Sequence, residues 1–224
     1  MNFVIIHFNT PQLTACLCGS VRKFHPDAKI IIFDNSTVNP FENPEIFCDE
    51  YIDNTKNQLI NFETELSKYQ VVQSIWDLNK CGSARHCITI QWLFDNLDVD
   101  EFVLLDSDIL LTKPFPFYNS DVPCVCEHET YGGHKDRALP FICYFNLKVL
   151  KSKNIRYFDG NRMNGLSNKG QPYDTGASFL EDLISNKIMY KQIRCSDYIV
   201  HFKNGSWTNK NYISWLLQNK KYWD

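Results

Sequence analysis

The sequence predicts a single α/β domain in which helices flank a mixed, largely parallel central sheet. Short apolar runs, typical of buried strands, alternate with helical patterns, and this order favours parallel strands joined by helices. Polar residues follow the apolar runs where the strands would end, which is where open α/β sheets bind ligands. No repeat or low-complexity linker divides the 224 residues, and a chain of this length can bury one substantial core.

Strands and helices can be assigned in chain order through the first half of the chain. Apolar runs predict strands over Phe3–Phe8, Lys29–Phe33 and Glu101–Asp106, and Glu50–Asp53 is expected as a short strand between the last two. The expected helices are Gln12–Phe24, Phe62–Tyr69 and Ser83–Asn96. From about Thr112 closely spaced prolines interrupt the alternation. Beyond that point we expect a strand over Phe141–Leu147 and a helix over Thr175–Asn186.

Composition excludes several classes of protein. Hydrophobic residues make up 44% of the chain and charged residues 22%, which is ordinary for a globular protein. The formal charge of −3 gives no electrostatic basis for binding nucleic acid. No apolar run approaches the roughly 18 residues of a membrane span, and Met1–His7 lacks the basic end and the length of a signal peptide. Without such a signal the nine cysteines are expected as reduced thiols in a cytoplasmic protein.

Asp106 and Asp108 carry the strongest functional signal. They stand at and just beyond the end of the apolar run that begins at Glu101, on the edge of the sheet where ligands bind. Two carboxylates there form a hard oxygen site suited to Mg²⁺ or Mn²⁺, which can in turn bind a diphosphate. Asp98 and Asp100 have the same spacing but precede the strand, so we expect them in a solvated turn.

Four segments, in this order, resemble glycosyltransferases of the GT-A fold, and most closely those of family 2. Phe3–Thr10 resembles the opening strand with its polar end, and Ile32–Thr37 resembles the second strand, whose Asp contacts the nucleobase. Asn79–His86 resembles the Asn-x-Gly-x-x-x-Ala-Arg-Asn loop and helix start beside the nucleotide. It is one residue shorter and has His86 where that pattern has Asn. Asp106–Asp108 stands where the family keeps its metal motif.

The resemblance implies a binding site for a nucleotide-sugar donor, with UDP as the expected nucleotide. The implied donor-binding residues in the first half of the chain are His7, Asn9, Asp34, Asn35, Gly82, Ser83, Arg85, Asp106 and Ser107. The segment at Asp34 is also typical of a simple turn, and Gly82 and Ser83 are also typical of a helix cap. Ser83 can serve both roles, because a helix start that points at a diphosphate is an anion site.

Tyr198–Trp207 resembles the C-terminal segment of several GT-A enzymes, in which a histidine completes the metal site. Neutral imidazole suits Mn²⁺ better than Mg²⁺, and the alternative is a partly buried strand histidine. Gly205 would let the backbone approach the phosphates, and Trp207 would pack or stack beside them. The implied ligands of the Mn²⁺ (or Mg²⁺) ion are Asp106, Asp108 and His201.

Asp174 is the expected catalytic base. Tyr173 and Asp174 resemble the Glu-Asp motif of inverting family members, with Tyr173 in place of Glu. In that motif a carboxylate at a helix start deprotonates the acceptor hydroxyl. Asp is also a favoured helix N-cap, and the two roles are compatible. Glu181, two helical turns further on the same face, is the second candidate, whereas we expect Asp182 to be solvated.

These observations predict a metal-dependent glycosyltransferase that moves a sugar from a UDP-sugar to a hydroxyl acceptor by inversion. Residues 1–111 would form the nucleotide- and metal-binding half, and residues 112–224 the acceptor-binding half. Retention stays open, because histidine-completed metal sites also occur in retaining GT-A families. A nucleotide-sugar-binding module without catalysis also stays open.

The resemblance implies a role in polysaccharide or glycolipid assembly, with a saccharide or lipid-linked saccharide as acceptor. The tail Asn211–Trp223 mixes aromatic residues with lysines. It would either dock on the inner face of a membrane that carries such an acceptor or pack on the domain as a terminal helix.

Two other enzyme classes fit the sequence less well. A haloacid-dehalogenase-type phosphatase expects Thr two residues after the second Asp, where this chain has Leu110. A sugar nucleotidyltransferase expects a Gly-rich, basic phosphate loop near the first strand, and Phe8–Pro11 is neither.

Overall fold

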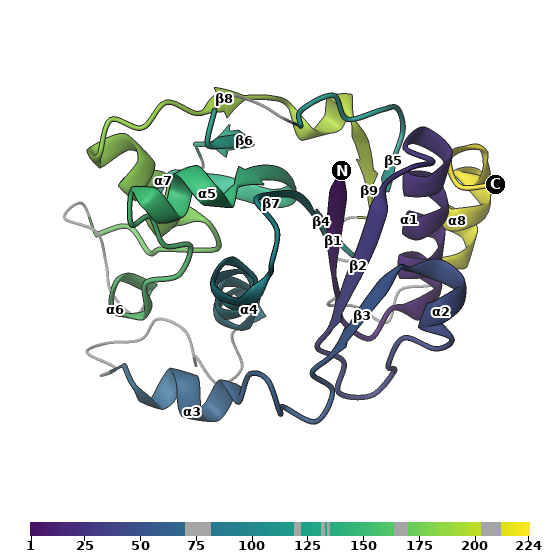
Figure 1. Ribbon diagram of the computed structural model, residues 1–224, viewed down its shortest axis with the longest axis horizontal. Helices are drawn as coiled ribbons and strands as arrows, with labels where there is room; N and C mark the ends of the chain where they lie inside the picture. The colour runs from purple at the N-terminus through teal and green to yellow at the C-terminus, as the bar shows by residue number, and fades with distance from the viewer. Residues whose placement is uncertain (70–81, 119–121, 131–132, 134, 164–169, 203–211) are drawn as a thin grey trace.

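A seven-stranded sheet runs through the computed structural model, which describes residues 1–69, 82–118, 122–130, 133, 135–163, 170–202 and 212–224 (Figure 1). Its strands are β1 (Asn2–His7), β2 (Lys29–Asp34), β3 (Glu50–Asp53), β4 (Glu101–Asp106), β6 (Cys124–Glu129), β7 (Arg137–Asn146) and β8 (Lys191–Gln192). They lie in the order β3-β2-β1-β4-β7-β6-β8. Neighbours from β3 to β4 are parallel, β7 is antiparallel to both β4 and β6, and β8 is parallel to β6. The mixed, largely parallel sheet expected from the sequence is confirmed.

Helices cover both faces of this sheet. The α-helices are α1 (Pro11–Phe24), α2 (Pro44–Phe47), α3 (Phe62–Ser67), α4 (Gly82–Asn96), α5 (Leu147–Ser152), α6 (Gly160–Met163), α7 (Ala177–Ser185) and α8 (Ile213–Gln218). Short 3₁₀ helices are present at Cys195–Asp197, before β9 (Ile199–His201), and at Lys220–Tyr222, after α8. Among the described residues, no helix is both long enough and apolar enough to cross a bilayer.

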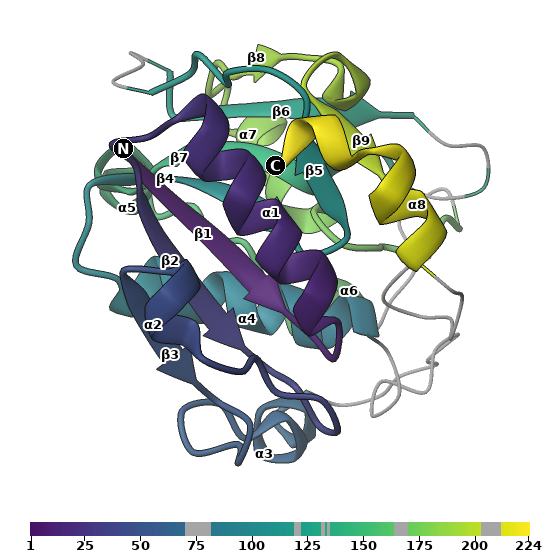
Figure 2. The ribbon, with the colours of Figure 1, turned by 90° about the vertical axis from the view of Figure 1, so that its right-hand side faces the viewer.

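Alternating side chains of the strands divide the interior into two cores. Val4 and Ile6 of β1 point to the core that contains α4 and α7. Phe3 and Ile5 point to the opposite core, which contains α1 and part of α8. Figure 2 shows α1 lying along its face of the sheet, with α8 beside it. Each of these four side chains is at most 4% exposed, and full burial of such a side chain stabilises a protein by about 1.5–3 kcal/mol.

A small second sheet pairs β5 (Ile109–Leu111) with β9 (Ile199–His201) in antiparallel register. Ile109 lies opposite His201, and the backbone N–H of Phe202 donates to the Asp108 carbonyl over 2.8 Å. The sheet therefore joins the segment just after β4 to a segment almost one hundred residues later in the chain.

The expected elements of residues 1–111 are all present, with ends that differ by at most two residues. Asp98 and Asp100 are exposed ahead of β4, as expected. The second half differs more. The strand expected from Phe141 begins at Arg137, and β6 and β8 were not expected. His201 lies in β9 and is partly buried, which matches the strand position given above as one alternative.

Helix α7 begins where the chain passes close to β7. Its N-cap is Gly176, which has a φ of +78° and no side-chain cap. A Cβ atom at Gly176 would lie 2.1 Å from the carbonyl oxygen of Ala138, so only glycine fits this close approach. The close contact holds Asp174 and Thr175, which immediately precede Gly176, beside β7.

Candidate active site

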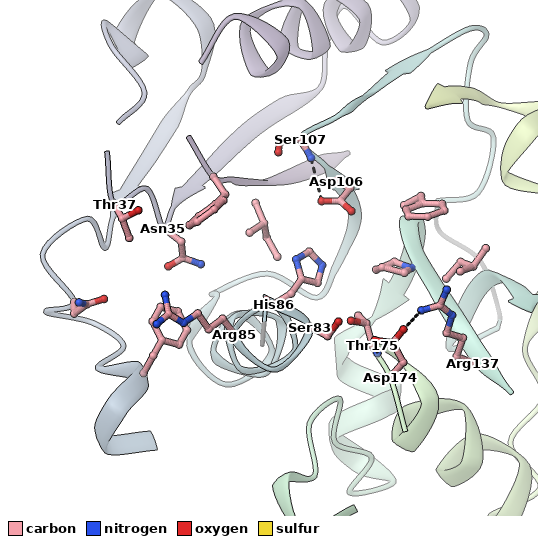
Figure 3. Close-up of a pocket in the computed structure, with 18 of the residues that line it drawn as sticks. Asn35, Thr37, Ser83, Arg85, His86, Asp106, Ser107, Arg137, Asp174 and Thr175 are labelled. Atoms are coloured by element: carbon pink, nitrogen blue, oxygen red, sulfur yellow. Dashed lines mark hydrogen bonds and ion pairs between the residues drawn. The ribbon is translucent and has the colours of Figure 1, made fainter. Parts of the chain in front are cut away.

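A cavity of about 750 Å³ opens at the edge of the sheet where β1, β2 and β4 end. Its walls come from the ends of these strands, the loop after β2, α3, the start of α4, β7 and the segment before α7. Figure 3 shows Asp106 on one side of this space, Asp174 and Arg137 on another, and Asn35, Thr37 and Arg85 at a third. The volume falls within the range typical of small-molecule sites.

Six of the residues implied for donor binding line the cavity: Asn35, Gly82, Ser83, Arg85, Asp106 and Ser107. Gly82 and Ser83 belong to the first turn of α4, whose unpaired N–H groups and helix dipole favour an anion. The guanidinium of Arg85 lies 5.5 Å from the ring centroid of Phe62, and both side chains line the cavity. This part of the cavity combines a positive side chain, a helix start and an aromatic ring.

Asp34 does not line the cavity, because its fully buried carboxylate is used inside the protein. It accepts hydrogen bonds from the backbone N–H of Ser36 and of Phe41, each at 2.7 Å, and from the Tyr51 hydroxyl at 2.8 Å. Asp34 therefore shapes the loop that follows β2. Its neighbour Asn35 lines the cavity.

Asn9 and His7 also serve this loop and do not line the cavity. The Asn9 side-chain oxygen accepts from three consecutive backbone N–H groups, at residues 37–39, over 2.9–3.0 Å. His7 is fully buried and bonds the Thr14 hydroxyl at 2.8 Å and the Asn39 carbonyl at 3.3 Å. Burial lowers the pKa of His7, so the ring is neutral near pH 7.

Asp108 and His201 lie side by side next to the cavity. Asp108 Oδ1 is 3.1 Å from His201 Nε2, and Asp108 is only 3% exposed. The imidazole stacks on the ring of Phe141, a lining residue, with centroids 4.2 Å apart. Asp106 lines the cavity itself. The antiparallel pairing of β5 with β9 produces this juxtaposition.

The donor atoms of Asp106, Asp108 and His201 suit a divalent metal. Neither carboxylate has a Lys or Arg partner within the described parts of the chain. Burial, reinforced by the neighbouring Asp108 charge, raises the pKa of Asp106 well above its usual value. Carboxylates that lack a cationic partner in this way are what a bound cation would compensate. Across the described residues, however, no three such side chains already converge to hold a metal ion.

Asp174 and Arg137 form an ion pair in the cavity wall. Asp174 Oδ2 accepts from Arg137, and Oδ1 accepts from the backbone N–H of Thr175 at 2.7 Å. Arg137 also donates from Nε to Glu129 over 2.6 Å. The expected N-cap role of Asp174 is not seen, because Gly176 occupies that position.

Glu181, the second candidate base, lies outside the cavity wall. It accepts hydrogen bonds from Lys135 and Tyr173, each at 2.8 Å. Burial alone would raise the pKa of Glu181, but these bonds and one from Arg162 outweigh burial and lower it. Asp182 is not solvated as expected, since Arg162 binds both of its carboxylate oxygens at 2.8 Å. This ion-pair network fixes α7 to α6.

Two cavity residues, Arg137 and His86, were not among the expected site residues. Nothing local in the sequence indicates Arg137, because its place depends on the pairing of β7. His86 carried a signal, since it departs from the Asn of the family pattern. Gly205 and Trp207 lie outside the described residues.

The fold is similar to that of solved glycosyltransferases. Mouse xyloside xylosyltransferase 1 matches with a TM-score of 0.51 and 9% identity, over 88% of this chain and 86% of that chain. The glycosyltransferase GlyE of Streptococcus pneumoniae matches with a TM-score of 0.49 and 13% identity, over 98% of this chain. The galactosyltransferase LgtC, in complex with donor and acceptor sugar analogs, matches with a TM-score of 0.43 and 14% identity, over 73% of this chain.

The chain has the GT-A fold of glycosyltransferases, as expected from the sequence. It spans 49% of the length of GlyE and 62% of that of LgtC. No protein-family model and no curated protein matches its sequence.

Proposed function

We propose that the protein is a metal-dependent glycosyltransferase that takes a sugar from a nucleotide-sugar donor, with UDP as the nucleotide, and delivers it to a hydroxyl acceptor. The observation that supports this proposal most directly is the composition of one cavity. Asp106, beside the Asp108–His201 pair, faces a space that also contains the first turn of α4 and, on another side, Asp174. The proposed diphosphate site, the proposed metal ligand Asp106 and the candidate base thus border one volume of a size typical of small-molecule sites.

The donor would lie with its diphosphate at the start of α4. The helix start favours an anion there, and Arg85, beside Phe62, adds positive charge on the nucleoside side. The loop after β2, with Asn35 and Thr37, and the ring of Phe62 would contact the nucleoside. We retain Gly205 and Trp207 as proposed residues on the phosphate side.

Asp106, Asp108 and His201 would hold Mn²⁺ or Mg²⁺, and the bound ion would neutralise charge on the leaving diphosphate. Asp108 and His201 already contact each other in the structure, so these two ligands would be in place before the metal binds. Their contact is supported by the β5–β9 ladder and by the Phe141 ring, so little ordering remains when the metal binds.

Asp174 would accept the proton of the acceptor hydroxyl in a single inverting displacement. Each of its oxygens accepts one bond in the structure, and a carboxylate oxygen has room for a second. Arg137 donates to this carboxylate and fixes its position in the cavity wall. The same ion pair supports a second possibility, in which Asp174 only positions Arg137 and transfer proceeds with retention. Glu181 is the weaker candidate base, because its oxygens face Lys135, Tyr173 and Arg162.

Residues 1–111 and 112–224 would contribute the donor and acceptor sides respectively. Asp106 and the start of α4 come from the first range, and Arg137 and Asp174 from the second. We further propose a saccharide or lipid-linked acceptor in polysaccharide or glycolipid assembly, on the cytoplasmic side of a membrane. Ile213 and Leu217 of α8, 59% and 65% exposed, would support peripheral membrane contact.

The test is thermal unfolding with UDP in the presence and absence of Mn²⁺. A ligand at one hundred times its Kd stabilises the native state by about 2.7 kcal/mol, which for a chain of this size raises Tm by roughly 5–10 °C. We expect this rise only when the metal is present. Asp108→Asn, which preserves the shape and the contact with His201, should abolish the metal-dependent part.

Asp100→Asn is the matched control, because it makes the same change in the exposed Asp-x-Asp pair ahead of β4. It should behave like the wild type. Equal stabilisation by UDP with and without a chelator would contradict the proposed metal dependence. Loss of the metal-dependent rise in Tm in Asp100→Asn would show that the site has been assigned to the wrong Asp-x-Asp pair.

A further inference from the structure

His86 is a cavity residue with one ring nitrogen, Nε2, that has no partner among the described residues. It lies on the first turns of α4 and lines the cavity. Its Nε2 is shielded from solvent and has no hydrogen-bond partner among the described residues. A buried polar nitrogen without a partner costs about 1–3 kcal/mol, and such a group in a native protein calls for an explanation, a catalytic role among them.

The surroundings of His86 locate it between the two ends of the proposed site. The charges of Asp108, on the metal side, and of Asp174, on the acceptor side, both act on its ring. Figure 3 shows the ring pointing into the space between Asp106 and the Ser83–Thr175 side of the cavity. In a donor whose diphosphate bridges the proposed metal ligands and the start of α4, and whose reacting carbon faces Asp174, the sugar would lie beside His86.

Burial lowers the pKa of His86 to about 4, against the opposing effect of the two carboxylates. At neutral pH the ring therefore has one N–H donor and one acceptor nitrogen and carries no charge. Either nitrogen can therefore bond a hydroxyl group, which accepts from the N–H or donates to the unprotonated nitrogen.

The charged groups at this point of the cavity disfavour an anionic sugar. The carboxylates of Asp106 and Asp174 border it, and the positive charge of Arg137 is already shared between Glu129 and Asp174. No other Lys or Arg of the described chain is placed here to receive a sugar carboxylate, since Arg85 lies at the nucleoside end beside Phe62.

We propose that His86 reads a hydroxyl group of the donor sugar and that this sugar is a neutral one. The inference rests on the proposed function, because it requires a nucleotide-sugar donor. It assigns to His86 a contact with the transferred group, distinct from the contacts that bind the nucleoside diphosphate.

The experiment compares dissociation constants by titration calorimetry, in Mn²⁺, for UDP, UDP-glucose, UDP-galactose and UDP-glucuronate. The informative quantity is the ratio of the constant for UDP to that for each UDP-sugar, because it isolates the contribution of the sugar. For the wild type we expect a ratio above one for at least one neutral sugar and no gain for the glucuronate. His86→Leu should reduce that ratio by roughly five- to tenfold, which corresponds to one lost hydrogen bond, and leave the constant for UDP unchanged.

His86→Asn, which keeps a donor and an acceptor, should recover part of the ratio, and His128→Asn, a histidine outside the cavity, should change neither constant. If His86 were only structural, His86→Leu would weaken UDP and UDP-sugars equally, and the inference would be overturned. A preference for UDP-glucuronate would overturn the neutral-sugar assignment. Failure of the wild type to bind UDP would remove the proposed function together with the inference. Binding of UDP without any gain from a sugar would remove the inference alone.

Discussion

The Arg137–Asp174 ion pair gives one cavity residue two separable roles. As a charge partner, Asp174 keeps Arg137 in place between β7 and the segment before α7. As a base, it would accept a proton from the acceptor. A helix-capping role is absent, so a substitution at Asp174 does not act through the stability of α7.

Asp174→Asn should therefore separate chemistry from binding. Asn keeps the shape and can still accept a hydrogen bond from Arg137, but it cannot take up the acceptor proton. Loss of a general base lowers the rate of transfer on the order of a hundredfold or more. We expect unchanged affinity for UDP with Mn²⁺ and transfer reduced by at least that factor, measured with an acceptor identified by screening.

Glu129→Gln provides the control for that variant, because it weakens the other anchor of Arg137 without altering Asp174. It should retain most of the transfer rate. Near-wild-type turnover by Asp174→Asn would favour Glu181 as base or a retaining mechanism instead.

Residue roles at strand ends were the least predictable part of the site. Asp34, Asn9 and His7 are polar and follow or end strands, as binding residues do, but the neighbouring loop uses their hydrogen-bonding groups. A sequence shows that a polar group reaches the sheet edge. It does not show whether a backbone N–H or a ligand will occupy that group.

At the scale of elements, the start of α7 determines how Asp174 and Thr175 meet the cavity. Residues 175 and 176 lie outside the helix, although the helix was expected to begin at Thr175. The reason is the left-handed backbone at Gly176, which the residue type permits but does not require. The carbonyl oxygen of Ala138 occupies the place that a side chain would take, so this position requires glycine.

Gly176→Ala should destabilise the protein more than Gly170→Ala. Both glycines have positive φ, +78° and +73°, so both variants incur the left-handed strain of about 1–2 kcal/mol. Only at Gly176 does the new methyl group collide with backbone, whereas nothing lies within 4 Å at Gly170. We expect an additional loss of about 1–3 kcal/mol in the free energy of unfolding by urea. Equal effects of the two substitutions would show that α7 moves away from β7 at no cost.

Elements that depend on local sequence were predicted well, and those that depend on distant pairing were not. The strands β1, β2 and β4 are continuous apolar runs, and such runs indicate buried strands from their own sequence. In contrast, β8 consists of only two residues, both exposed. Strand β9 consists of three residues that pair with β5. Such strands exist because a partner is present, so their own residues carry little signal.

At the scale of the whole molecule, buried histidines link stability to pH. Burial lowers the pKa of His7, His25 and His86, so below about pH 6.5 the unfolded chain binds more protons than the native protein. Their contribution to stability is complete above that pH and is lost as pH falls toward the native pKa values. Asp106, whose pKa is raised, contributes in the opposite direction.

His86→Asn should therefore reduce the acid sensitivity of the fold. With a native pKa of about 4 for His86, the wild type should lose about 2 kcal/mol more than the variant between pH 7.5 and pH 5. Urea unfolding at the two pH values measures this difference. An identical loss in both proteins would show that the His86 ring is protonated as easily in the native state as in the unfolded chain.

The joining of Asp108 to His201 through β5 and β9 also bears on how the protein would acquire the proposed metal ion. The two side chains are 93 positions apart in the chain, so they meet only after the chain has been synthesised through His201 and has closed a long loop. Partly folded chains therefore lack the paired ligands and have little means of capturing an ion prematurely. A cation bound by this pair would stabilise the complete fold and not the partly folded states. In the cell, metal binding would therefore be one of the last steps of folding.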